Sequence, residues 1–240
     1  IRFVSWNVNG LTHYIKRKKI LSYLQNKRAD VDLLQEAHLD DFESAKLCRD
    51  WVGRVIHSNY PNLPKDGNGP SRKRGIAILF RKTLPATIVK TWIDPEGQYV
   101  FAKVRIGECS LCIGSIYAPT GNKRHFLLQI NRLLIEIVAS QYVIGGDWNL
   151  AKDAILDRTG PIDSVNNADR ALLGDMISDH GLNDHWRLTH PTDKEYTFLS
   201  PVHGTQSRLD YFLVSHKMMA SIQESQIMEA ALSDHTSVSS

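Results

Sequence analysis

The 240-residue chain has only three cysteines, and it has no apolar run long enough to cross a membrane. Three cysteines cannot form a disulfide framework, which indicates a reducing, intracellular compartment. A membrane-spanning helix needs about 20 consecutive apolar residues, so an integral membrane protein is excluded and no membrane partner is expected. Short repeats and low-complexity tracts are missing as well, which excludes collagen, coiled-coil and disordered chains. The sequence shows no signal-peptide pattern.

The length is compatible with a self-sufficient globular domain. A chain of this size can bury about 70–75% of the surface that it exposes when unfolded, so it needs no metal or disulfide to fold. The sequence begins at Ile1 without a methionine and ends in a polar, serine-rich segment. We therefore expect one domain over residues 1–240, cut from a longer polypeptide.

The charge balance is mildly basic, with 29 Lys and Arg against 26 Asp and Glu, a net charge of +3. Basic residues cluster locally in Lys16-Arg17-Lys18-Lys19, Arg72-Lys73-Arg74 and Lys123-Arg124. Each cluster can be a solvated surface or a contact for a polyanion, and the charge alone leaves both interpretations open.

Cys109 and Cys112 have the spacing of a metal or redox pair. A zinc site needs two further Cys or His ligands, and a redox pair usually begins a helix. This pair lies instead in an apolar, strand-like run, which predicts two ordinary strand cysteines.

Strands and helices alternate along the chain, which predicts the α/β fold class with packed sheets flanked by helices. The expected strands are residues 2–6, 31–35, 75–80, 100–106, 110–117, 142–146 and 209–214. The expected helices are residues 12–26, 123–139 and 168–179, the first with Tyr14, Leu21 and Leu24 on one side and the last ending before Gly181. The second is expected to carry one apolar stripe of 3.6-residue period, made of Phe126, Ile130, Leu133, Leu134 and Ile137. Residues 60–75 are rich in Pro and Gly and predict a surface loop.

Polar residues follow the apolar strands repeatedly, at the places where rigid scaffolds hold catalytic groups. Six such segments are Trp6-Asn7-Val8-Asn9-Gly10, Gln35-Glu36, Ile116-Tyr117-Ala118-Pro119, Gly146-Asp147-Trp148-Asn149, Ser207-Arg208-Leu209-Asp210-Tyr211 and Ser233-Asp234-His235. Any one of them can be a simple turn, but six together favour a site built from the whole chain.

This ordered set resembles the endonuclease/exonuclease/phosphatase superfamily over residues 3–235. Within it, the chain is similar to the apurinic/apyrimidinic endonuclease-like domain of non-LTR (LINE-type) retrotransposons. The segments that carry this closer likeness are Glu36-Ala37-His38-Leu39, Asp184-His185-Trp186-Arg187, His190-Pro191 and Tyr196-Thr197-Phe198-Leu199-Ser200. The resemblance implies a DNase I-like four-layer α/β sandwich and a position N-terminal to a reverse transcriptase in the same polypeptide. Ala37 stands where many relatives have Thr.

The resemblance also implies a Mg²⁺-dependent endonuclease that nicks one strand of double-stranded DNA and leaves a 3′ hydroxyl to prime reverse transcription. Glu36 and Asn7 are the expected metal-site residues, with Mn²⁺ as a substitute for Mg²⁺. The expected catalytic residues are Asp147, His235, Asp210, Tyr117, Asn149 and Asp234. Asp147 would position or deprotonate the attacking water, and Asp210 would hold His235 in its charged form.

Several further side chains are expected to contact DNA, namely Asn9, His38, Arg158, Thr197, His203 and Arg208. Residues 199–207 lie between the strand-like segments 196–198 and 209–214, which predicts a hairpin that could probe a groove of the duplex. A DNA substrate in chromosomes implies a nuclear location.

Other patterns favour no separate site. His180, His185 and His190 are five residues apart, which does not suit a zinc site on a helix, and Trp51, Trp92 and Trp186 are expected to pack in or beside the core. A phosphoesterase acting on a small or lipid phosphoester is the alternative function, and an inactive binding module is a third. The basic loops favour DNA over a lipid, and the complete set of reactive side chains argues against an inactive module.

Overall fold

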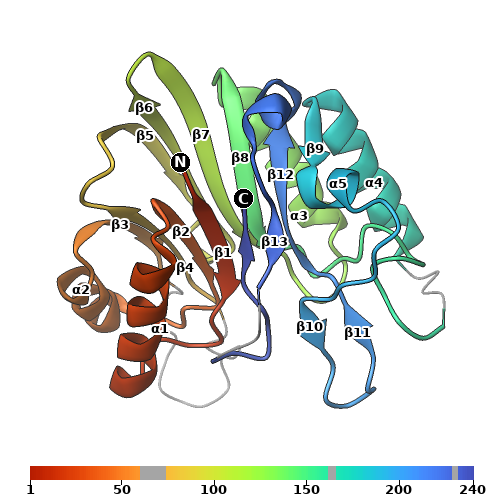
Figure 1. Cartoon of the computed structure of the whole chain (residues 1–240), viewed down its shortest axis with the longest axis horizontal. Helices are drawn as coiled ribbons and strands as arrows, with labels where there is room; N and C mark the ends of the chain where they lie inside the picture. Colours follow the sequence, from red (N-terminus) through yellow and green to blue (C-terminus); the bar gives the residue numbers. More distant parts are fainter. Residues whose placement is uncertain (60–73, 162–165, 229–231) are drawn as a thin grey trace.

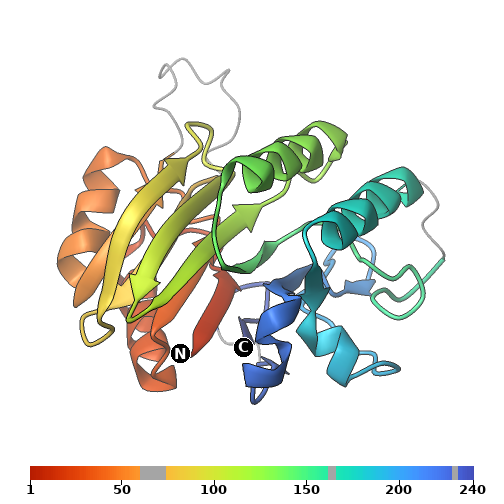
Figure 2. The ribbon, with the colours of Figure 1, turned by 90° about the horizontal axis from the view of Figure 1, so that it is seen from above.

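The computed structural model describes residues 1–59, 74–161, 166–228 and 232–240. Two six-stranded sheets pack face to face, and helices cover both outer faces (Figures 1 and 2). This arrangement confirms the predicted four-layer α/β sandwich. The predicted surface loop, apart from its last two residues, and the basic residues Arg72 and Lys73 lie outside the described residues.

The first sheet has the strand order β13-β14-β1-β2-β4-β3. Its strands are β1 (Phe3–Asn7), β2 (Val31–Gln35), β3 (Gly53–Ser58), β4 (Ile76–Arg81), β13 (Gln226–Ile227) and β14 (Val238–Ser239). Helices α1 (Tyr14–Lys27) and α2 (Asp41–Asp50) lie against its outer face and share a buried cluster with it.

The second sheet has the strand order β5-β6-β7-β8-β12-β9. Its strands are β5 (Ala86–Ile93), β6 (Tyr99–Ile106), β7 (Cys109–Tyr117), β8 (Gln141–Asp147), β9 (Leu182–Asp184) and β12 (Asp210–Ser215). Helices α3 (Arg124–Glu136) and α4 (Asn167–Asp179) pack on its outer face, and α5 (His185–Thr189) follows β9. A 3₁₀ helix, η1 (His216–Ser221), follows β12, and a two-stranded hairpin of β10 (Phe198–Leu199) and β11 (Gln206–Ser207) projects beyond the sheet (Figure 1).

The apolar periodicity of α3 is confirmed. The five residues of its predicted stripe, Phe126, Ile130, Leu133, Leu134 and Ile137, are all buried against the second sheet. The stripe of α1 is only partly right, because Leu21 and Leu24 are buried but Tyr14 is 59% exposed in the first turn. Arg17 takes a buried place in this helix instead, and its guanidinium is paired with Glu43 and Asp50.

All seven expected strands are present, with ends shifted by at most two residues. Strands β3, β5 and β9 and helices α2 and α5 were not predicted, because they are short or alternate weakly. Asp40 caps α2 by accepting a hydrogen bond from the Glu43 amide, a local signal that the sequence carried. The α4 helix ends as predicted, with Gly181 in a left-handed conformation after it.

The cysteines, tryptophans and spaced histidines are structural. Cys109 and Cys112 lie in β7 without a disulfide, and the three Trp residues named above pack in or against the core as predicted. His180 is hydrogen-bonded to Asn131 and His190 stacks on Trp186, while the buried Nδ1 of His185 has no hydrogen-bond partner among the described residues. In the same part of the chain the three histidines form no group able to hold a metal ion. In the same part of the chain, every helix is too short or too polar to cross a membrane.

Strand register brings the ends of the central strands to one edge of the molecule. In the first sheet, Asn7 at the end of β1 pairs with Gln35 at the end of β2, in parallel. In the second sheet, Asp147 pairs with both Tyr117 and Asp210. Residues far apart in the sequence therefore meet where the two sheets share an edge.

One buried carboxyl group lies away from this edge and has no hydrogen-bond partner in the described part of the chain. Asp32 in β2 is fully buried, and among the described residues neither carboxylate oxygen has a hydrogen-bond partner. Its neighbours in the adjacent strands are Val4 and Leu79, both fully buried. Burial raises the pKa of Asp32 from 3.8 to about 8, although Arg81 opposes the shift.

This group makes the stability of the fold depend on pH. Because the pKa is higher in the folded state, the folded protein keeps a proton that the unfolded chain releases between about pH 4 and 8. The stability that this proton supplies is complete below about pH 4 and is lost as the pH rises to about 8. At about 1.4 kcal/mol per pKa unit, the loss is roughly 5 kcal/mol.

We expect Asp32→Val to raise the free energy of unfolding at pH 7.5 by about 3–5 kcal/mol. The valine removes the cost of burying a carboxyl group that must either hold its proton at this pH or be buried as a charge. Urea unfolding at several pH values measures the effect, and Asp175→Asn on the exposed side of α4 is the control. Equal pH slopes for the parent and Asp32→Val between pH 5 and 8 would contradict the assignment.

Candidate active site

Asn7 joins the ends of the two sheets through one side-chain amide. Its Nδ2 donates to Glu36 Oε1 at 2.9 Å and to Asp147 Oδ2 at 3.0 Å. Its Oδ1 accepts the Asn9 amide at 3.1 Å, so both ends of the side chain are fixed. Glu36 follows β2 of the first sheet and Asp147 ends β8 of the second, and Asn7 therefore holds carboxylates from both sheets in one site.

Glu36 is a carboxylate held ready in its ionised form. Burial alone would raise the pKa of Glu36, but hydrogen bonds from His38, Asn7 and Tyr117 together hold that pKa below its ordinary value. The His38 Nε2 lies 3.2 Å from Glu36 Oε2. The side chain keeps 15% of its surface exposed, so it borders the open edge of the site.

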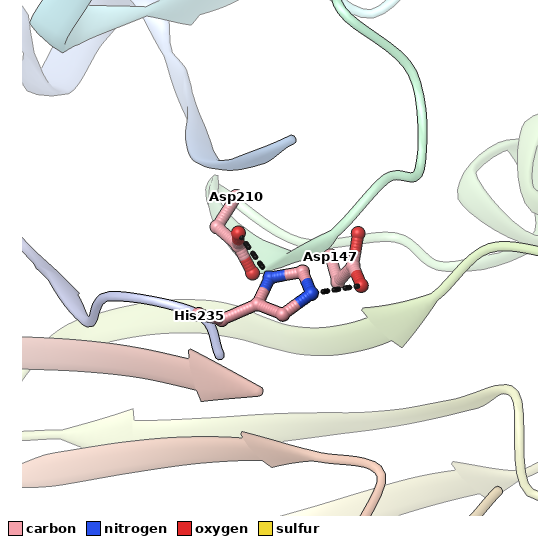
Figure 3. A group of neighbouring side chains, drawn as sticks. All are labelled: Asp147, Asp210 and His235. Carbon is pink, nitrogen blue, oxygen red and sulfur yellow. Dashed lines mark hydrogen bonds and ion pairs between the residues drawn. The ribbon is translucent and has the colours of Figure 1, made fainter. Parts of the chain in front are cut away.

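His235 lies between two aspartates from neighbouring strands, as Figure 3 shows. Its Nδ1 is 2.7 Å from Asp210 Oδ2, and its Nε2 is 3.8 Å from Asp147 Oδ2. All three residues are at most 5% exposed. The short contact to the Asp210 carboxylate places a proton on Nδ1 and turns Nε2, the second site of protonation in the charged ring, toward Asp147.

Burial and charge act in opposite directions on this group. Burial would lower the pKa of His235, but the carboxylates of Asp210 and Asp147 raise it well above its ordinary value. Burial raises the pKa of Asp147, and the charge of Asp210 raises it further against the opposing effect of His235. The site therefore holds a charged imidazole next to a carboxylate that takes up a proton readily.

The backbone is strained around the site. Five non-glycine residues of the described chain have positive φ, and four of them surround the carboxylates: Asn9, Glu36, His38 and Asn149. Such conformations cost of order 1–3 kcal/mol each and persist where the surrounding structure enforces them. Gly146 lets the backbone approach β7 closely just before Asp147, because a Cβ at this position would lie 2.1 Å from the Ile116 carbonyl oxygen.

Three of the predicted catalytic residues form the rim of the site. Tyr117 at the end of β7 is hydrogen-bonded to Glu36. The Asn149 amide donates to Asp147 Oδ1 at 2.8 Å, and Asn149 Nδ2 donates to the Ala118 carbonyl. Asp234 is exposed and accepts a hydrogen bond from Asn9 Nδ2 at 3.2 Å. The structure thus brings all eight predicted catalytic and metal-site residues to the same edge.

The expected DNA contacts divide into two groups. Asn9 and His203 are exposed, while His38 and Arg158 are half-buried. The predictions for Thr197 and Arg208 are wrong, because both residues are only 1% exposed. The Thr197 hydroxyl accepts backbone hydrogen bonds, and the Arg208 guanidinium is enclosed between Asp157 and Asp184.

The predicted hairpin exists, but its second strand is not the one expected. Phe198–Leu199 pairs with Gln206–Ser207, while Asp210–Ser215 belongs to the second sheet. The loop between the paired strands carries the exposed residues Val202 and His203. The hairpin is short because the chain must turn into β12 two residues after β11 ends.

Sequence patterns did not reveal two supports of His235. The Phe198 ring lies 4.8 Å from the imidazole, centre to centre, and Trp6 Nε1 donates to the His235 carbonyl at 3.1 Å. Both residues belong to segments that carry the family resemblance, but neither was predicted to have a role in the site. Their contacts depend on tertiary packing, for which the sequence held no local signal.

Two carboxylate groupings can hold a divalent cation. Asp147, Asp210 and His235 each offer a ligand atom, and these atoms lie within 4.8 Å of one another. A cation bound among them would have to displace the 2.7 Å bond between His235 and Asp210. Glu36 offers ionised oxygen atoms at the open edge without that cost, and hard oxygen ligands suit Mg²⁺.

Comparison with known families identifies the family of this chain. Residues 4–235 match the model of the endonuclease/exonuclease/phosphatase family. The chain belongs to this family. It is therefore an enzyme that hydrolyses phosphate esters, as the sequence predicted, and the family match spans all six polar segments that follow strands.

Relatives in this family include both transposon proteins and repair-type nucleases. The chain is 28% identical to the transposon TX1 uncharacterized 149 kDa protein of Xenopus laevis, over 97% of the chain and 17% of that protein. It is 25% identical to an exodeoxyribonuclease of Bacillus subtilis, over 99% of the chain and 98% of the relative. It is 28% identical to a probable RNA-directed DNA polymerase from transposon BS of Drosophila melanogaster, over 62% of the chain and 15% of that protein. The chain thus spans only a small part of the transposon proteins, and their presence agrees with the predicted retrotransposon-type likeness.

Solved structures confirm the fold. The AP endonuclease LMAP from Leishmania major superposes with a TM-score of 0.77 at 20% identity, over 99% of this chain and 86% of that one. The catalytic domain of Xenopus laevis APE2 gives the same TM-score and identity, over 100% and 90% of the two chains. The DNase I-like sandwich predicted from the resemblance is therefore correct.

Arg208 belongs to a buried ionic network that lies next to the site. Its guanidinium contacts Asp157 at 2.8 Å and Asp184 at 2.7 Å, and it lies over the rings of Trp186 and Tyr211. The network is two residues from Asp210, so it anchors the start of β12.

We expect Arg208→Met to destabilise the fold by about 3–5 kcal/mol, because the buried carboxylate of Asp184 loses its ionic partner and that of Asp157 keeps only Arg187. Urea unfolding measures the loss, and Arg105→Met on the exposed side of β6 is the control, with a change within about 0.5 kcal/mol. If Arg208→Met instead kept full stability and only weakened DNA binding, the buried assignment would be wrong.

Proposed function

We propose that the chain is a Mg²⁺-dependent endonuclease that nicks one strand of double-stranded DNA and leaves a 3′ hydroxyl able to prime reverse transcription. One observation carries this proposal: Asn7 holds Glu36 and Asp147 together, next to the His235–Asp210 pair. A site with one ionised carboxylate, one carboxylate that takes up a proton and one charged imidazole suits hydrolysis of an anionic diester.

Glu36, supported by Asn7, would hold the divalent cation, with Mg²⁺ as the natural ion and Mn²⁺ as a substitute. The donor set fits, because Glu36 is ionised, partly exposed and oriented by three hydrogen bonds. When bound, the cation supplies neutralisation of the phosphate charge.

The protein's own side chains would handle the protons. Asp147 accepts a proton from the attacking water, whose oxygen bonds to phosphorus while the bond from phosphorus to the 3′ oxygen breaks. The 3′ oxygen leaves as a hydroxyl with a proton taken from solvent water, and the phosphate stays on the 5′ side of the break. Asn149 and Tyr117 lie beside Asp147 and donate to phosphate oxygens, and His235 stabilises the added negative charge with its Nε2 proton.

The names of the relatives support the proposed substrate and domain arrangement. Transposon proteins are among them, which supports a reverse transcriptase domain in the same polypeptide. A chromosomal DNA substrate would in turn place the nicking reaction in the nucleus. The relatives named as an exodeoxyribonuclease and as a DNA repair nuclease, the latter from Danio rerio and 25% identical over 98% of the chain, support DNA as substrate. A small or lipid phosphoester remains the alternative within the same family, and release of phosphocholine from sphingomyelin without DNA nicking would favour it.

We expect Glu36→Gln to slow plasmid nicking by roughly three orders of magnitude, because about 4 kcal/mol of charge neutralisation is lost. Conversion of supercoiled to relaxed plasmid over a Mg²⁺ titration measures the rate, and EDTA should stop the parent completely. Glu96→Gln is the matched control, since Glu96 is 65% exposed and pairs with Arg74. Nicking by Glu36→Gln at the parent rate would refute the metal assignment.

The hairpin loop is the expected source of sequence preference, since groups that contact the common phosphate cannot select a sequence. Replacing residues 201–204 with Gly-Ser-Gly-Ser should flatten or shift the map of nicks on a plasmid of known sequence. The total rate should fall much less, because Gln206 keeps its bonds to Thr159 and the carboxylates are untouched. An unchanged nick map would exclude this loop as the reader of sequence.

A further inference from the structure

Thr197 connects three segments that meet at the catalytic pair. Its hydroxyl oxygen accepts the amides of Leu209 at 2.9 Å and Asp210 at 3.1 Å. Its backbone carbonyl accepts the Thr236 amide at 2.8 Å, and its backbone amide donates to Ser207 at 3.0 Å. The residue is 1% exposed, so these contacts occupy it from all sides.

These hydrogen bonds reach Asp210 itself and Thr236, the residue that follows His235. Asp210 is the first residue of β12, and Thr197 holds its amide just before the sheet begins. His235 lies on a separate segment, next to Thr236, whose amide Thr197 binds. The next residue, Phe198, contacts His235 directly. It forms a backbone bridge with His235, and its ring centre lies 4.8 Å from that of the imidazole.

We infer that Thr197 is a positioning residue that sets the distance between Asp210 and His235. This inference rests on the proposed function, since it assigns Thr197 to the chemistry of that site and away from DNA binding. The reason is geometric. Asp210 and His235 are 25 positions apart in the sequence, and Thr197 is bonded to the backbone of both segments.

The Thr197 hydroxyl is the separable part of this connection. Valine has the same branched shape and keeps the backbone bonds, but it leaves the amides of Leu209 and Asp210 without an acceptor. Serine keeps the acceptor and loses only the methyl group. Comparing the two substitutions therefore tests the hydroxyl alone.

We expect Thr197→Val to lower kcat for plasmid nicking by about 10- to 100-fold, since misplacement by about 1 Å costs rates of this order. KM for DNA should change by less than about threefold, and Thr197→Ser should stay within about threefold of the parent in both constants. In the background His235→Ala, the further change Thr197→Val should have little effect, because residues that act as one unit are not additive.

An NMR measurement tests the same inference without turnover. The proton between His235 Nδ1 and Asp210 should give a resolved signal in the parent and in Thr197→Ser, and the signal should broaden or disappear in Thr197→Val. A parent that fails to nick DNA would refute the proposed function, while this signal would still decide the role of Thr197.

Three results would overturn the inference: an unchanged imidazole signal in Thr197→Val, a raised KM with unchanged kcat, or full additivity with His235→Ala. If Thr197→Val does not fold, Thr197→Cys takes its place, because a thiol is a poor acceptor of similar size. The same signal and the same split between kcat and KM then apply.

Discussion

The whole site depends on a double hydrogen bond from one amide, that of Asn7, to carboxylates that belong to different sheets. This contact is possible only if the two sheets are packed so that β1, β2, β7 and β8 end at the same edge. The core between the sheets, with Leu33, Ile113 and Phe212 among its buried residues, supplies that packing. Apolar burial over the whole sandwich thus fixes the position of a few polar groups.

Placing four charged groups at this edge is costly, and the structure compensates each of them. Glu36 receives three donors, Asp147 receives two, and His235 is bonded to Asp210. One carboxylate oxygen of Asp210 is buried without a partner among the described residues, so the compensation there is incomplete. Buried groups with shifted pKa values, here Asp147 and His235, are the usual mark of a reactive site.

The sequence predicted the fold class and nearly every residue of the site because that information is local. Apolar runs of five to nine residues predicted the strands, and polar residues directly after them predicted the side chains that the structure brings together in the candidate site. The short elements were missed for the same reason, since β3 and α5 carry little periodicity of their own.

Thr197 and Arg208 were expected at the surface, but tertiary packing buries both residues. Thr197 and Arg208 have side chains that suit DNA, and nothing near them in sequence shows that Asp157, Asp184 and the start of β12 enclose them. The partner of a buried polar group comes from a distant segment. Residue type and spacing therefore predict that such a residue matters, but not what it binds.

The most direct test of the proposed nicking reaction is the analysis of plasmid ends after incubation of supercoiled plasmid with the protein and Mg²⁺. The account predicts relaxed circles, each with one break, whose 3′ ends a DNA polymerase extends without prior treatment because they are hydroxyls. Plasmid that stays supercoiled, or breaks whose 3′ ends need removal of a phosphate before extension, would contradict it.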